Sequence, residues 1–147
     1  QHGRGVDLVE QRRLRVEAGV LGNAEALARN LPAAEQQFRS AIAAGSPGAG
    51  VHANLGNVLM RQGRLPEARE AYEQAIVLDD NYADAHLNLG VLLDLYIGDN
   101  TLALQHYERY LALSPAGDAA VGKWVADLRN RKPSSVAQAD VKVSKKE

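Results

Sequence analysis

The sequence lacks several residue types that would support chemistry. Its 147 residues include no cysteine, one methionine, one tryptophan and one phenylalanine. The chain therefore forms no disulfide, thiolate nucleophile or thiolate metal centre. A cysteine-free composition suits the bacterial periplasm and the cytoplasm equally. No apolar run approaches the ~18 residues of a membrane-spanning helix, so we expect no membrane span.

Motifs for catalysis and phosphate binding are also missing. The sequence contains no glycine-rich phosphate loop, no His-Glu-x-x-His, no Gly-x-Ser-x-Gly and no calcium-binding loop. The carboxylates of Glu67, Glu70 and Glu73 are typical of a solvated helix face. We therefore predict that the chain is not an enzyme and carries no cofactor.

Basic residues do not dominate the body of the chain. Residues 1–130 contain 12 Lys and Arg against 16 Asp and Glu, whereas residues 131–147 contain 5 against 2. A protein that binds a phosphate backbone needs a basic face, so the acidic body predicts no nucleic-acid partner. Residues 132–147 have no large apolar side chain other than valine, which predicts a flexible basic tail.

One helical unit occurs three times along the chain. Leu21-Gly22 is followed after 34 residues by Leu55-Gly56 and after 34 more by Leu89-Gly90. Further equivalent positions continue the register: Leu31-Pro32 and Leu65-Pro66, Ala34 and Ala68, Phe38 and Tyr72, Ala41 and Ala75. Within each unit these residues recur at helical spacing, which places them on one packing face.

The repeated small and aromatic residues predict how the helices pack. A glycine in the middle of a helix costs about 1 kcal/mol relative to alanine, and close approach of a neighbouring helix would offset that cost. The aromatic residues are expected to fill the gap between one helix pair and the next. Pro32 and Pro66 stand at the expected starts of second helices. The helices are expected at 16–29, 32–44, 49–62, 66–78, 83–96 and 101–113.

The third unit departs from the pattern. Aligning Tyr107 with Tyr72 requires an offset of 35 residues rather than 34, so we expect one extra residue in the turn 97–100. The small residue of the earlier units is replaced by Tyr110, which is too large for the same helix crossing.

An amphipathic segment follows the third unit. Residues 118–129 carry apolar side chains at helical spacing, as expected for the capping helix that a repeat array needs. Trp124 is placed to cover Tyr107 or Tyr110. The alternative is that Trp124 stacks on a ligand.

The unit length and the small residues at fixed places resemble the tetratricopeptide repeat (TPR) family, whose unit is a pair of antiparallel helices of about 34 residues. The resemblance covers about residues 15–131. It implies an all-α, right-handed solenoid of three helix-turn-helix repeats, at about 15–48, 49–82 and 83–117, with a C-terminal capping helix at about 117–131. Residues 1–14 are expected to be an N-terminal extension or the end of a preceding helix. The chain begins with Gln1 and shows no signal-like segment, so we expect a piece of a longer or processed chain.

In the TPR family the first helices of successive units line a concave groove that holds extended or helical peptides. Carried over position by position, this groove comprises Val20, Asn23, Leu27, Asn54, Asn57, Arg61, Asn88, Val91 and Leu95. Because asparagine donates and accepts hydrogen bonds at once, its amides could clamp the backbone of an extended peptide. The alternative is that these asparagines bond to the backbones of neighbouring helices.

The best-defined binding mode of the family is a two-carboxylate clamp, in which Lys and Arg beside Asn hold the acidic C-terminus of cytosolic chaperones. Asn23 and Asn54 match the asparagines of the clamp, but Gly19, Asp84 and Asn88 stand where its cations would be. The carboxylates of such a ligand would lose water without gaining a partner. We therefore expect no binding of chaperone C-terminal tails.

Histidines are the remaining candidates for metal binding. His52 and His86 occupy the same place in successive units, so we expect them to lie on the order of 10 Å apart or more, since packed helices are separated by 8–10 Å. That separation is too large for a shared metal. His106 lies on a second helix and His2 near the start. We predict no metal site.

The predicted function is a non-catalytic scaffold or adaptor that binds a partner peptide or protein in the concave groove. One alternative is an assembly module that self-associates or stacks on further repeats of a larger complex, and another is a regulatory domain of an enzyme. Arg exceeds Lys and alanine is abundant, as in bacterial TPR proteins of the cell envelope, which favours the periplasm or envelope over the cytoplasm. The tail from Lys132, at up to ~3.3 Å per residue, is long enough to reach back into the groove.

Overall fold

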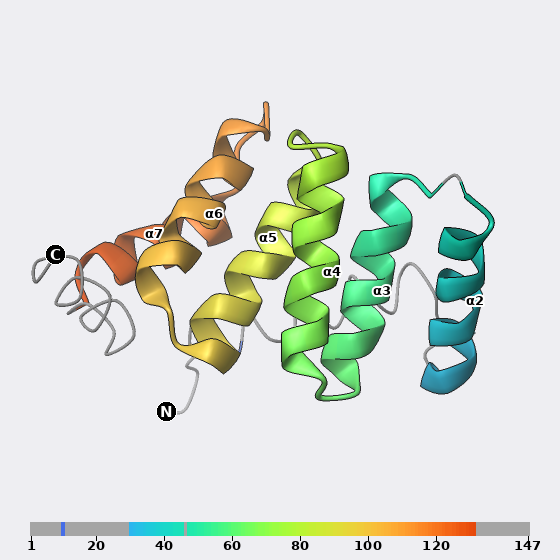
Figure 1. Cartoon of the computed structure of the whole chain (residues 1–147). Coiled ribbons are helices and arrows are strands. Elements are labelled where there is room, and N and C mark those ends of the chain that lie inside the picture. Colours follow the sequence, from blue (N-terminus) through green and yellow to red (C-terminus); the bar gives the residue numbers. More distant parts are fainter. Residues whose placement is uncertain (1–9, 11–29, 46, 132–147) are drawn as a thin grey trace, which may run out of the picture.

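The chain folds into a row of helices (Figure 1). The computed structural model describes residue 10 and residues 30–45 and 47–131. The elements are α2 (Leu31–Ala43), α3 (Ala49–Arg61), α4 (Leu65–Leu78), α5 (Ala83–Val91), the π-helical segment η1 (Leu92–Ile97), α6 (Asn100–Ala112) and α7 (Ala119–Arg129). Each helix packs against the next in chain order. Among the described residues there is no strand, and the expected all-α solenoid is confirmed.

Helices α2 to α6 begin and end within one residue of the expected ranges, when α5 and η1 are taken together, and α7 is two residues shorter at each end than the expected capping helix. The expected helix 16–29 and the tail 132–147 lie outside the described residues. The limits of the expected domains therefore stay predictions.

Local polar residues and prolines set the helix starts. The side chains of three N-cap residues accept a hydrogen bond from a backbone N–H in the first turn: Asn30 from Ala33 at 3.1 Å, Asp99 from Leu102 at 3.1 Å and Asp118 from Val121 at 3.3 Å. Such caps satisfy N–H groups that have no partner within the helix. Pro32 and Pro66 stand in the first turns of α2 and α4, as predicted.

The repeated glycines allow an aromatic ring to lie directly on a helix backbone. A Cβ atom at Gly56 would lie 2.7 Å from the ring of Tyr72, and one at Gly90 would lie 2.7 Å from the ring of Tyr107. Both tyrosines are 0% exposed. The close approach predicted from the glycines is confirmed, and it is made by the tyrosine of the same unit.

The extra residue of the third unit lies inside its first helix. The N–H of Gly98 donates to the carbonyl of Leu93 at 2.7 Å, five residues back, which is the π-helical pattern. Gly63 and Gly98 follow the first helices of their units and have φ of 78° and 88°. Each glycine stands five residues before the first buried alanine of the next helix, which is Ala68 in α4 and Ala103 in α6. The spacing from glycine to alanine is thus the same in both units. The prediction that the turn holds the insertion is wrong, because the widened helix absorbs it.

The C-terminal helix closes the array. Helix α7 buries four residues, Val121, Trp124, Val125 and Leu128. Trp124 is 1% exposed, and its ring lies 5.8 Å from that of Tyr107. This contact is the predicted one, and the near-complete burial of the ring opposes the ligand-stacking alternative. Tyr110 on α6 also bonds to the start of α7, because its hydroxyl donates to the N-cap residue Asp118 at 2.8 Å.

The glycine contact generates a stability prediction. Gly56→Ala is expected to destabilise the protein by about 1–3 kcal/mol, because the new methyl group overlaps the ring of Tyr72. Gly122→Ala is the matched control, since nothing lies within 4 Å of its Cβ position in α7. That substitution is expected to stabilise the protein by about 0.5–1 kcal/mol. Urea unfolding followed by circular dichroism measures both, and changes of the same sign would contradict the packing role of Gly56.

Candidate partner-binding site

Two asparagines of successive first helices are hydrogen-bonded to each other, and a buried tyrosine bonds to one of them. Asn57 on α3 is 5% exposed, and its Oδ1 accepts a hydrogen bond from the hydroxyl of Tyr72 at 2.5 Å. The same oxygen accepts a second bond from Nδ2 of Asn88 on α5 at 3.0 Å. Burial raises the pKa of Tyr72, so its hydroxyl stays protonated and remains a donor.

This arrangement fixes which way both amides point. Because Oδ1 of Asn57 receives both bonds, its Nδ2 must face away from Tyr72. Among the described residues, no hydrogen bond reaches Nδ2 of Asn57 or Oδ1 of Asn88. The Nδ2 of Asn57 therefore remains as a donor and the Oδ1 of Asn88 as an acceptor. These two groups match the carbonyl oxygen and the N–H of a peptide unit. Both bonds join side chains, so bonding to neighbouring helix backbones does not account for these two asparagines.

The other predicted groove residues have mixed surroundings. Asn54 and Leu95 are half-buried, Arg61 is exposed, and Val91 is 0% exposed. Arg61 forms no ion pair with any carboxylate in the described part of the chain. Val20, Asn23 and Leu27 lie outside the described residues. The groove assignment as a whole stays a prediction, in which Asn57 and Asn88 are the members that the structure brings together.

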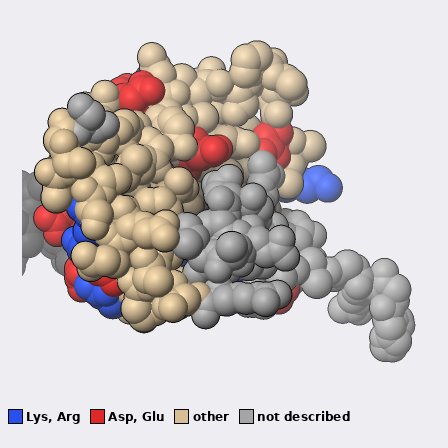
Figure 2. Space-filling view, turned by 90° about the vertical axis from the view of Figure 1, so that its right-hand side faces the viewer, with Lys and Arg blue, Asp and Glu red and all other residues tan. Residues whose placement is uncertain are grey.

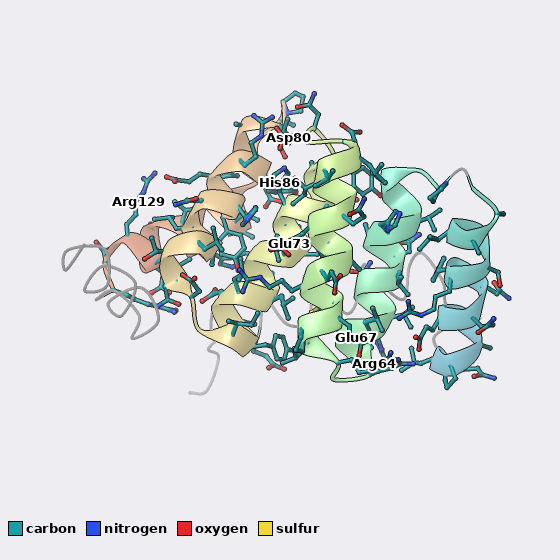
Figure 3. The ribbon with its side chains drawn as sticks, in the orientation of Figure 1. Arg64, Glu67, Glu73, Asp80, His86 and Arg129 are labelled. Carbon is teal, nitrogen blue, oxygen red and sulfur yellow. The ribbon has the colours of Figure 1, made fainter. Side chains whose placement is uncertain are left out.

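A pair of histidines that the sequence does not predict lies between α5 and α6. Nδ1 of His86 and Nδ1 of His106 are 3.1 Å apart, and their rings are 5.3 Å apart. His86 and Asp80 are labelled near each other in Figure 3, and Nε2 of His86 lies 2.8 Å from the backbone carbonyl oxygen of Asp80. Since a carbonyl only accepts, the network assigns the proton of neutral His86 to Nε2, and His106 then donates from Nδ1. One sequence signal points to the pair. The residue equivalent to His106 in the preceding unit is Ala71, so the histidine is a departure from the repeat.

Comparison with known proteins identifies the fold. Residues 56–95 match the family model described as TPR repeat. The chain has the TPR fold. The second TPR domain of human RPAP3, solved in complex with the HSP70 peptide SGPTIEEVD, matches with a TM-score of 0.63 and 21% identity over 84% of this chain and 99% of that chain. The Arabidopsis OM64 TPR domain matches with a TM-score of 0.65 and 17% identity over 86% and 100%. No curated protein matches the chain.

A third TPR domain, that of Sgt2 from Aspergillus fumigatus, matches with a TM-score of 0.62 and 18% identity, covering 88% of this chain and 82% of that chain. At these identities the likeness concerns the fold. The TPR fold is an interaction module that presents side chains from its helices. The absence of enzymatic activity stays a prediction.

On this TPR fold the charged residues are dispersed. On the face drawn in Figure 2, Lys and Arg occur in small groups next to Asp and Glu, with no continuous basic area on its described surface. Within residues 30–45 and 47–131, no helix is long and apolar enough to cross a bilayer. The same residues contain no cluster of three or more His, Asp or Glu that could hold a metal ion.

The histidine pair makes stability depend on pH. Burial, and to a smaller extent the neighbouring His86, lower the pKa of His106 from 6.5 to about 4, although Glu73 and Asp80 act in the opposite direction. Between these values the unfolded chain binds more protons than the folded chain. The free energy of unfolding is therefore expected to fall as the pH is lowered from 6.5 to 4.

Urea unfolding at pH 7, 6, 5 and 4 measures this effect. His106→Gln should weaken the pH dependence, because the variant has no imidazole at that position. Burial also lowers the pKa of His52, so wild type and variant are compared directly. Equal pH dependence in the two proteins would contradict the assignment to His106.

Proposed function

We propose that the chain is a protein-interaction adaptor whose first helices bind an extended segment of a partner protein. The observation that carries the proposal is the amide pair of Asn57 and Asn88, which leaves one donor and one acceptor without a described partner. A peptide backbone supplies the matching acceptor and donor at every residue. Arg61, which is exposed, is proposed to contact the partner beside this pair.

The buried tyrosine makes the amide pair suitable for recognition. A free asparagine side chain rotates, and binding then costs conformational entropy. Here the hydroxyl of Tyr72 holds Asn57, and Asn57 holds Asn88, before any partner arrives. The pair is therefore preorganised. The RPAP3 domain, which shares this fold, is in complex with a peptide, which supports a peptide ligand for this chain.

The partner is proposed to differ from acidic chaperone tails. Asp84, in the first turn of α5, is exposed and stands where the family's clamp has a cation. Its charge repels a carboxylate. Neutral Asn88 can bond to a peptide unit but does not neutralise an acidic side chain. A ligand with a neutral or basic segment at this position fits these residues better.

Asn88→Ala tests the proposal, because it removes the free acceptor and leaves the Tyr72–Asn57 bond in place. Peptides are first selected from a displayed random library against the intact chain, and their dissociation constants are measured by calorimetry. Loss of a hydrogen bond worth about 1 kcal/mol is expected to weaken binding roughly five- to tenfold. Gln105→Ala, at an exposed position of α6, is the control. An unchanged affinity in Asn88→Ala, or an equal loss in Gln105→Ala, would contradict the proposal.

Introducing the cations of the family's clamp at positions 84 and 88 tests the prediction that the chain does not bind chaperone C-terminal tails. The double variant Asp84→Lys/Asn88→Arg is expected to bind SGPTIEEVD at least tenfold more tightly than the wild type, because each charge-assisted hydrogen bond contributes about 1.5–3 kcal/mol. Fluorescence polarisation with the labelled peptide measures the gain. The matched control is Glu73→Lys/Val77→Arg on α4, which makes the same charge change at two exposed positions with the same spacing. Strong wild-type binding, or an equal gain in the control, would contradict the prediction.

A further inference from the structure

An open cavity of about 280 Å³ lies between α2, α3 and α4. Helix α2 contributes Arg39 and Ile42, α3 contributes His52, and α4 contributes Glu70 and Ala71. The volume is close to the lower end of the range for small-molecule pockets, which is enough for one ring-bearing side chain. Neither Asn57 nor Asn88 lines the cavity, so it is separate from the amide pair.

The repeat explains why the cavity exists. His52 is equivalent to His86 at an offset of 34 residues, and Ala71 is equivalent to His106 at an offset of 35, because η1 adds one residue. In the third unit the imidazole of His106 lies beside His86, with its Nδ1 3.1 Å from that of His86. In the second unit Ala71 has only a methyl group at the same position. The cavity therefore corresponds to the place that the third unit fills with its own imidazole.

The lining of the cavity suits an imidazole. His52 is half-buried, and burial lowers its pKa, so its ring is neutral at pH 7 and has one donor and one acceptor nitrogen. No hydrogen bond from the described residues reaches this ring. Ile42 adds apolar surface for a ring face. Glu70 is exposed at the rim and pairs with no cation in the described ranges, so the rim carries an available negative charge.

We propose that this cavity is a docking site for a histidine side chain of a partner protein, which takes the place that His106 takes beside His86 and donates its ring N–H to His52. The free carboxylate of Glu70 selects a basic residue next to that histidine. The chain itself supplies the precedent for the occupant, because it closes the equivalent space of the next unit with an imidazole. This site makes the adaptor able to hold a second partner segment on α2 and α4.

The probe is 4-methylimidazole, the histidine side chain in isolation, titrated into the 147-residue chain while the ring signals of His52 are followed by NMR. A ligand of six heavy atoms is expected to bind with a dissociation constant on the order of 1 mM. Ala71→His fills the cavity and should weaken binding at least tenfold. Ala126→His, the same change at an exposed position of α7, should leave it unaltered. No shift of the His52 signals, or equal binding to the wild type and Ala71→His, would overturn the proposal.

Two further measurements do not depend on the folding of Ala71→His. The ligand 1,4-dimethylimidazole, which has no N–H, should bind to the wild type at least fivefold more weakly than 4-methylimidazole; equal affinity would overturn the proposed hydrogen bond to His52. The blocked dipeptide His-Lys should bind about threefold more tightly than His-Glu, as expected for a pairing with an exposed carboxylate. A preference for His-Glu would overturn the role of Glu70.

The reverse variant is the positive control. His106→Ala opens the equivalent space beside His86, and 4-methylimidazole should then shift the His86 signals and raise the Tm of this variant more than that of the wild type. Absence of this rescue would overturn the equivalence of the two spaces on which the proposal rests.

Discussion

The contact between a tyrosine ring and a glycine backbone controls the arrangement of the described units. It can form only because Gly56 and Gly90 lack a side chain, and it brings each pair of helices close together. The ring then carries its hydroxyl into the buried interior next to the first helix. A buried hydroxyl needs a hydrogen-bond acceptor. The choice of that acceptor decides what else each unit can bind.

The two described units provide different acceptors. Asn57 accepts from Tyr72, whereas the equivalent residue of the third unit is Val91, which cannot accept. The π-helical segment brings Asp94 to Tyr107 instead, at 3.1 Å. Asp94, whose side chain is fully buried, also accepts from Arg131 beyond α7 at 3.4 Å. A neutral acceptor thus links the second unit to the next first helix, and a charged one ties the third unit to its capping helix.

The sequence predicts the structural features that depend on the 34-residue repeat and on helical spacing. The helix limits, the glycine contact and the proline positions follow from the repeat, and the capping role of Trp124 follows from the helical spacing of the apolar residues after the repeat. An offset of 35 residues reveals an insertion, but it does not distinguish a longer turn from a widened helix, so η1 was missed. The partnership of His86 and His106 was missed because they lie on different helices of one unit. Asn57 and Asn88 were named from the resemblance, whereas the hydroxyl that orients them depends on the packing of Tyr72.

Positions at which the units differ carry the chemistry of this protein. Equal residues at equal positions would give every unit the same surface, and selective binding requires differences between surfaces. Ala71 and His106 share a position and a histidine neighbour, yet one leaves a cavity and the other fills it. Asn57 and Val91 share a position, yet only Asn57 has an amide to offer. The repeated residues therefore hold the helices in place, and the substitutions between units create both proposed binding sites.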